Sequence, residues 1–166
     1  MRHLYLNQKI LAVRDKFAVL DDQEQPVYQV AGSLFRIPKQ FEITDTSGRV
    51  VGTVTKKVVA LMPRFDLNID RRTVVTIQKK VTFFKPRYEL IAAGLTVQGD
   101  FWDMNFEVVR DGVVVGSVAK RWFSIGDKYE ISIANDDDEL IMVGLVVAID
   151  YVKRLEAAGR RSSSSE

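Results

Sequence analysis

NDDDELIMVGLVVAIDYVKRLEAAG, residues 135–159, decides the fold, because it departs from the alternating pattern of the chain before it. Leu140–Ile149 carries no charge, so an element built from it is apolar on all sides and has to be buried all round. Acids crowd the beginning of the stretch, cations come late, and Gly159 is a residue that can end a helix. These features predict a buried helix over about 137–155.

The apolar run has two other interpretations. Its valines and isoleucines also suit a further strand. A membrane-spanning helix needs about 20 apolar residues, whereas this run breaks at Asp150 after ten. We favour a helix that fills the interior of a sheet, in which Gly144 lets a strand approach closely.

Residues 4 to about 134 alternate apolar and polar side chains, with turn signals at short intervals. This pattern is typical of an antiparallel sandwich or barrel. Asp111-Gly112 is the clearest hairpin signal, since both residues tolerate a positive φ. Counting each aromatic-led strand, the return strands and an opening segment gives twelve strands, and closure would leave no exposed edge. The aromatic residues that begin strands are Phe17, Phe41, Phe65, Tyr88, Phe106 and Tyr129.

A closed barrel of twelve strands is wider than side chains alone can fill, because about eight strands already reach that limit. The sequence therefore predicts a mainly β protein in which a closed antiparallel barrel encloses a hydrophobic C-terminal helix. We expect one domain over residues 1–158, followed by a disordered polar tail over 159–166.

The composition excludes several classes of protein. The formal net charge of +2 gives no argument for a nucleic-acid partner. The absence of cysteine removes disulfides, thiolate metal sites and palmitoyl anchors. The N-terminal residues contain no apolar run of signal-peptide length. We expect a cytoplasmic protein with no transmembrane span, with peripheral membrane association left open.

Three stretches align without a gap: VGTVTKKVVALMPRFDL (51–67), VVTIQKKVTFFKPRYEL (74–90) and VGSVAKRWFSIGDKYEI (115–131). Each contains a β-branched strand, two adjacent cations, an aromatic residue and an acid. If each stretch folds as a hairpin-like unit, the second cation lies opposite the acid, and each such ion pair contributes about 0.2–1 kcal/mol. The predicted ion pairs are Lys57–Asp66, Lys80–Glu89 and Arg121–Glu130.

The remaining cations of the repeat could concentrate positive potential near one rim of the barrel. A basic rim suits a phosphate head group or an acidic protein partner. The alternative is a solvated rim that only discourages aggregation. The residues of this predicted basic rim are Lys56, Lys79, Lys120, Arg64, Arg87 and Lys128.

Catalytic motifs are missing from the sequence. His3 is the single histidine and lies near the N-terminus, so we expect neither a Ser-His-Asp triad nor a histidine metal cluster. The acids at 136–139 do not have the spacing of an EF-hand loop, and their place before a helix explains them electrostatically. We expect no enzyme activity, no metal and no cofactor.

WFSIGDKYEISIANDDDELIMVGLVVAID (122–150) resembles the closing segment of the LURP-one-related proteins. The stretches DGVVVGSVAKR (111–121) and VQGDFWDMNFEV (97–108) agree with this resemblance. The family belongs with the Tubby C-terminal domain and the phospholipid scramblases in one barrel superfamily, which implies a twelve-stranded barrel around a central helix. Tubby domains bind phosphoinositides through basic residues. Scramblases are palmitoylated on cysteine, and the lack of cysteine here argues against scrambling.

The resemblance and the basic rim together favour a non-catalytic binding or scaffold module that recognises an anionic ligand or phospholipid head group. The alternative is a structural or protein-interaction domain with no small ligand. A scramblase-like membrane protein and an enzyme with an unrecognised site rank below both.

Overall fold

The computed structural model describes residues 1–7, 16–33, 37–58, 62–81, 86–91, 94–100, 103–123 and 126–163. These residues hold twelve strands, a short 3₁₀ helix η1 and one α-helix α2. The strands are β1 (Arg2–Asn7), β2 (Lys16–Leu20), β3 (Pro26–Gly32), β4 (Gln40–Asp45), β5 (Val50–Lys56), β6 (Arg64–Ile69), β7 (Arg72–Val81), β8 (Pro86–Ile91), β9 (Leu95–Asp100), β10 (Asn105–Arg110), β11 (Val113–Phe123) and β12 (Gly126–Ile133). The helices are η1 (Asp136–Asp138) and α2 (Glu139–Ser163).

Neighbouring strands are antiparallel and follow the order β1-β12-β11-β10-β9-β8-β7-β6-β5-β4-β3-β2. Most ladders contain five to eight register pairs. Two joints are short: β8 and β9 share two register pairs, and β1 and β2 share Tyr5 opposite Leu20 and Leu6 opposite Val19. A mainly β antiparallel sheet with one C-terminal helix is thus confirmed, whereas closure into a barrel depends on these two short joints.

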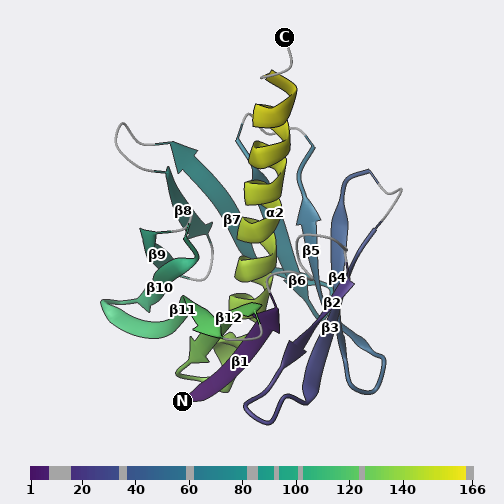
Figure 1. Ribbon diagram of the computed structural model, residues 1–166, viewed down its shortest axis with the longest axis vertical. Helices are drawn as coiled ribbons and strands as arrows, with labels where there is room; N and C mark the ends of the chain where they lie inside the picture. The colour runs from purple at the N-terminus through teal and green to yellow at the C-terminus, as the bar shows by residue number, and fades with distance from the viewer. Residues whose placement is uncertain are drawn as a thin grey trace.

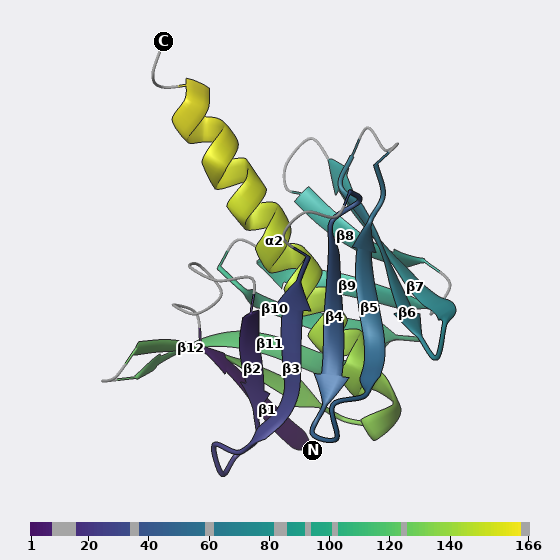
Figure 2. The ribbon, with the colours of Figure 1, turned by 90° about the vertical axis from the view of Figure 1, so that its right-hand side faces the viewer.

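The helix α2 runs through the middle of the molecule, with strands on both sides of it (Figure 1). Its C-terminal turns project beyond the strands (Figure 2). Every residue from Ile141 to Asp150 is buried, while Leu140 is half-buried and Ala157–Arg160 is exposed. The predicted interior helix is therefore present. No helix in the described part of the chain combines the length and the hydropathy needed to cross a bilayer.

Both ends of α2 differ from the prediction. The 3₁₀ turn η1 precedes the helix, and Asn135 caps that turn without a side-chain hydrogen bond. The helix continues through Gly159 to Ser163, so residues 159–163 are helical and not a disordered tail. A glycine inside a helix costs only about 1 kcal/mol relative to alanine, so Gly159 need not end one. Residues 164–166 lie outside the described residues.

Two buried carboxylates fix the start of α2 to the strands. Asp138 accepts hydrogen bonds from Arg110 Nη1 and Nη2 at 3.1 and 2.7 Å. Glu139 lies 2.9 Å from Arg2 Nε and accepts a hydrogen bond of 2.5 Å from the Tyr28 hydroxyl. Burial, followed by this hydrogen bond to Glu139, raises the pKa of Tyr28. Asp138 and Glu139 therefore serve as anchors for arginine side chains.

The inner face of the sheet is lined with the aromatic residues of the repeat. Their side chains are buried at the same level in alternate strands. Tyr88 is the exception, because its side chain is not among those that the structure describes. These buried residues are Phe17, Phe41, Phe65, Phe106 and Tyr129. In the buried part of α2, a Cβ built on Gly144 would lie 2.8 Å from Cδ1 of Leu67, which confirms the close approach of a strand.

Two of the predicted cross-strand ion pairs are present. Lys57 Nζ lies 2.6 Å from Asp66 Oδ2, and Arg121 Nε lies 2.8 Å from Glu130 Oε2. The side chains of Lys80 and Glu89 lie outside the described side chains. The repeat therefore places a cation and an acid on adjoining strands, as the sequence indicates.

The predicted register was wrong by two residues. Thr55 lies directly opposite Asp66, and Ala119 lies directly opposite Glu130. Each ion pair is consequently diagonal, which long side chains can reach on a twisted sheet. The joint between β7 and β8 has the same offset, with Gln78 opposite Glu89.

Candidate functional site

The predicted basic rim is divided between two faces of the sheet. Lys56, Lys79 and Lys120 each follow a buried β-branched residue by two positions, so they share the inner face with it. Arg64 and Lys128 each precede a buried aromatic residue and therefore lie on the outer face. The side chain of Arg87 lies outside the described side chains. The structure does not bring all of these cations together on one surface.

Lys128 also differs from the other predicted rim residues in its ion-pair partner. Its ammonium group lies 2.6 Å from Glu24, which belongs to the turn between β2 and β3. Arg64, by contrast, has a buried Nε without a hydrogen-bond partner among the described residues. These two outer-face cations do not share one environment.

The inner cations meet α2 where the helix leaves the sheet. Tyr151 is the centre of this region, because Phe41 and Phe65 pack edge-on against its ring, with ring centroids 5.2 and 6.1 Å away. Lys56 Nζ lies 6.0 Å from the centre of the Tyr151 ring, and the Arg154 guanidinium lies 5.6 Å from it. Cations over an aromatic face are attracted by its quadrupole.

Lys79, which is on β7, lies beside the next turn of α2 and forms an ion pair with Glu156 there. Burial lowers the pKa of Lys79, and the nearby charge of Arg160 adds to this effect. We name the residues Lys56, Lys79, Tyr151 and Arg154 the helix-exit cluster. Among the described residues, Lys56 has no carboxylate partner and the Tyr151 hydroxyl makes no hydrogen bond. Both groups remain able to contact a ligand.

Lys120 lies on another side of α2, near Lys153. Burial lowers the pKa of Lys153, and the carboxylates of Asp150, Asp103 and Asp100 oppose that shift while Lys120 reinforces it. The three inner cations of the repeat therefore surround the helix at its exit and do not form a separate outer patch.

A buried acid lies directly below the helix-exit cluster. Asp150 Oδ2 lies 3.1 Å from Arg154 Nε, one turn along the helix. Burial raises the pKa of Asp150, while Arg154 and Lys153 act in the opposite direction. The ion pair with Asp150 thus neutralises part of the Arg154 charge. Lys56 is the cation of the cluster that has no carboxylate partner among the described residues.

The residues that sequence reasoning missed are on the helix. Tyr151, Lys153 and Arg154 follow directly after the apolar run, where the helix leaves the interior. The alternating pattern of the strands contained a signal for these residues, because side chains two positions apart lie on the same face. The first cation of each pair is therefore on the inner face, toward the helix. That cation therefore meets the first polar turn of the helix.

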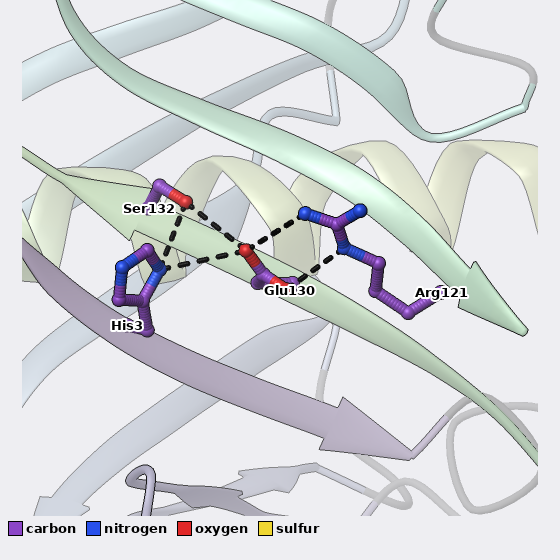
Figure 3. Close-up of polar contacts among 4 residues, drawn as sticks. All are labelled: His3, Arg121, Glu130 and Ser132. Carbon is purple, nitrogen blue, oxygen red and sulfur yellow. Dashed lines mark hydrogen bonds and ion pairs between the residues drawn. The ribbon is translucent and has the colours of Figure 1, made fainter. Parts of the chain in front are cut away.

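A second polar cluster crosses the outer face of β1, β12 and β11 (Figure 3). His3 Nδ1 lies 3.1 Å from Ser132 Oγ and 3.5 Å from Glu130 Oε1. Arg121 completes the cluster by donating two hydrogen bonds to Glu130 at 2.8 and 3.2 Å. Serine and carboxylate meet the same ring nitrogen, so the imidazole cannot relay a proton between them as a catalytic triad requires.

The acid sensitivity of the fold should depend on this cluster. The hydrogen bond from Arg121 holds the pKa of Glu130 below its ordinary value of 4.5. The unfolded chain therefore binds more protons than the folded one as the pH falls below 4.5, and the ion pair's contribution to stability is lost there. We expect Glu130→Gln to lower the melting temperature at neutral pH, and we expect the difference to disappear in acid.

Melting curves of both proteins across the acid range measure this effect. Glu42→Gln is a suitable control, because Glu42 lies exposed on β4. A difference between wild type and Glu130→Gln that stays constant down to strong acid would contradict the assignment.

An antiparallel sheet wrapped around one buried helix, with cations gathered where that helix emerges, defines a mainly β, helix-filled domain. The chain belongs to the LURP-one-related family, whose model matches residues 2–150. The resemblance seen in the sequence is thereby confirmed.

A relative agrees with this assignment, and a solved structure agrees with the fold. The uncharacterised protein YxjI of Bacillus subtilis (strain 168) is 33% identical over 152 residues, which cover 92% of this chain and 94% of YxjI. The crystal structure of a protein from Arabidopsis thaliana superimposes with a TM-score of 0.63 at 16% identity, over 91% of this chain and 90% of the plant protein. The plant structure supports the fold alone.

Proposed function

We propose that this domain, closed into a barrel by the short joint between β1 and β2, is a non-catalytic binding module for an anionic ligand. The ligand binds at the helix-exit cluster. The observation that carries the proposal is Lys56, an inward-facing cation over the Tyr151 ring with no carboxylate partner among the described residues.

The chemistry of the cluster suits a phosphate group. Lys56 supplies a compact charge, Arg154 supplies a planar fork of donors, and Tyr151 supplies a neutral hydroxyl. Charge-assisted hydrogen bonds from such groups to phosphate oxygens are stronger than neutral ones. A phosphate-bearing head group of a phospholipid is the ligand class that we propose.

A structural role for the same cations is the second candidate. The Lys79–Glu156 ion pair supports it, because this inner cation already has a partner on α2. On this interpretation the cations of the repeat hold the emerging helix in place, and the domain contacts other proteins without any small ligand.

Charge reversal separates the two candidates. We expect Lys56→Glu, Lys79→Glu and Lys120→Glu together to weaken the binding of a soluble inositol phosphate by about tenfold or more, measured by titration calorimetry. The matched control instead reverses three exposed cations outside the cluster, as Lys16→Glu, Arg71→Glu and Arg72→Glu, and should bind like the wild type. The corresponding three-glutamine variant, checked by its melting curve, covers the case in which the glutamates disturb the helix.

Two outcomes contradict the proposal. Retained saturable binding by the inner-face triple variant removes the helix-exit cluster as the site. Absence of binding by the wild type, with a lower melting temperature for the inner-face variant alone, supports the structural role.

A further inference from the structure

The end of the sheet where α2 emerges exposes large apolar side chains from three separate elements. Ile37 lies between β3 and β4 and is 87% exposed. Val58 and Met62 lie between β5 and β6 and are 64% and 39% exposed. Leu155 lies on the projecting part of α2 and is 37% exposed.

These elements adjoin one another. The backbone N–H of Lys56 donates to the carbonyl of Lys39 at 2.9 Å, which joins the two loop regions. Lys56 and Arg154 both lie over the Tyr151 ring, which joins them to the helix. Figure 2 shows the projecting helix and these strand ends on the same side of the molecule.

Cations are interspersed among these apolar side chains. Lys57 is half exposed beside Val58, and Arg160 is exposed near the end of the projecting helix. Lys39 and Lys56 lie closer to the sheet. The apolar side chains of Ile37, Val58, Met62 and Leu155 come from separate elements and have cations around them. They therefore form a projecting surface and not a continuous apolar groove. We name this surface the helix-exit tip.

The opposite end of the sheet carries exposed charges of both signs. Its turns and strand ends carry the acids Asp22, Asp70, Asp111, Asp136 and Asp137 and the cations Arg49, Arg71 and Arg72. Val50 and Val113 are exposed at this end too, so it offers apolar positions away from the helix-exit tip for comparison.

We propose that the helix-exit tip docks onto the surface of an anionic phospholipid bilayer. The four apolar side chains enter the boundary between head groups and acyl chains, and the cations around them face the lipid phosphates. Interfacial binding of this kind combines buried apolar area with attraction to anionic lipid. This inference rests on the proposed function, because the helix-exit cluster would supply the phosphate contact.

Charge decides between the possible occupants of the tip. A second copy of the chain, docked tip to tip, would bring cations against cations, which is unfavourable. An anionic bilayer complements the positive charge and also accepts separate apolar side chains that do not form one groove. It is thus the occupant to which the proposal commits.

The test uses the full-length protein and sedimentation with vesicles. We expect binding to vesicles of phosphatidylcholine mixed with phosphatidylglycerol, weaker binding at high salt, and little binding to phosphatidylcholine alone. The variant Ile37→Ser with Val58→Ser should bind the mixed vesicles about tenfold or more weakly. It should keep its affinity for the soluble inositol phosphate, because the helix-exit cluster is unchanged.

The control variant carries Val50→Ser with Val113→Ser at the opposite end. Val113 and Val58 are both 64% exposed, so these two positions are matched in residue type and exposure. The control should bind vesicles like the wild type. All of these side chains are exposed, so both variants should melt near the wild-type temperature.

Failure of this inference can be told apart from failure of the proposed function. Binding of the inositol phosphate without binding to mixed vesicles overturns the membrane inference alone. A second result would be vesicle binding that survives the reversal of Lys56, Lys79 and Lys120 but is lost in the Ile37→Ser, Val58→Ser variant. This result would support the helix-exit tip as the docking face and would rule out the helix-exit cluster as the phosphate site. Equal loss in the control variant, equal binding to neutral vesicles, or a dimer in solution that the tip variant dissociates overturns the docking proposal.

Discussion

Gly144→Leu should destabilise the protein by about 1–3 kcal/mol or more, because there is no room for a side chain at that point of α2. A Cβ at Gly144 would lie 2.8 and 3.0 Å from the Cδ1 and Cδ2 atoms of Leu67. Leu67 is fully buried, and β6 is hydrogen-bonded on both sides, to β5 and to β7. Neither the helix nor the strand can move away freely. Urea denaturation of the variant measures the loss.

The same substitution at Gly159 is the matched control. Nothing lies within 4 Å of a Cβ built there, and the position is on the same helix. Since leucine is a better helix former than glycine, Gly159→Leu should be neutral or stabilising by up to about 1 kcal/mol. Adding Leu67→Ala to Gly144→Leu should recover part of the lost stability. Equal effects at the two glycines would contradict the packing described for α2.

The buried part of α2 could be predicted because its signal is local. Ten successive residues without a charge offer no polar face to water, so burial was expected over 140–149; residues 141–149 are buried and Leu140 is half-buried. The hairpin at Asp111-Gly112 was similarly local, and both residues adopt positive φ, at 51° and 79°. The C-terminal end of the helix could not be predicted in this way, because Gly159 permits a helix to stop without forcing it to do so.

The register of the repeat could not be read from the sequence, because a shift of two residues preserves the inner and outer faces. Lys57 and Asp66 lie on the outer face in either register, and only the turn geometry decides whether they are opposite or diagonal. The predicted basic rim failed to gather on one surface for a related reason. Lys56 and Arg64 differ in face, and the prediction grouped residues by their level along the strands alone.

Removal of α2 should prevent folding. A chain that ends at Asn135 lacks every buried residue from Ile141 to Asp150, so the inner faces of the strands would be left without a packing partner. It also loses the carboxylates that hold Arg110 and Arg2 at the start of the helix. Burial of the remaining apolar surface cannot offset the conformational entropy of ordering the strands.

The control is a chain that ends at residue 158. It lacks only residues 159–166, and it retains the buried part of α2, the helix-exit cluster and Glu156. Gly159 and Arg160 are exposed, so their removal should cost the core little. This shorter chain should unfold cooperatively, close to the melting temperature of the full-length protein.

Thermal unfolding of the 1–135 chain beside the 1–158 chain, followed by circular dichroism, tests most directly whether α2 is the core of the domain. The structure predicts a cooperative transition for 1–158 and no cooperative transition for 1–135. A native-like strand spectrum and a cooperative melt from the 1–135 chain would show that the sheet folds without the helix, and would contradict the account of both the core and the site built around the emerging helix.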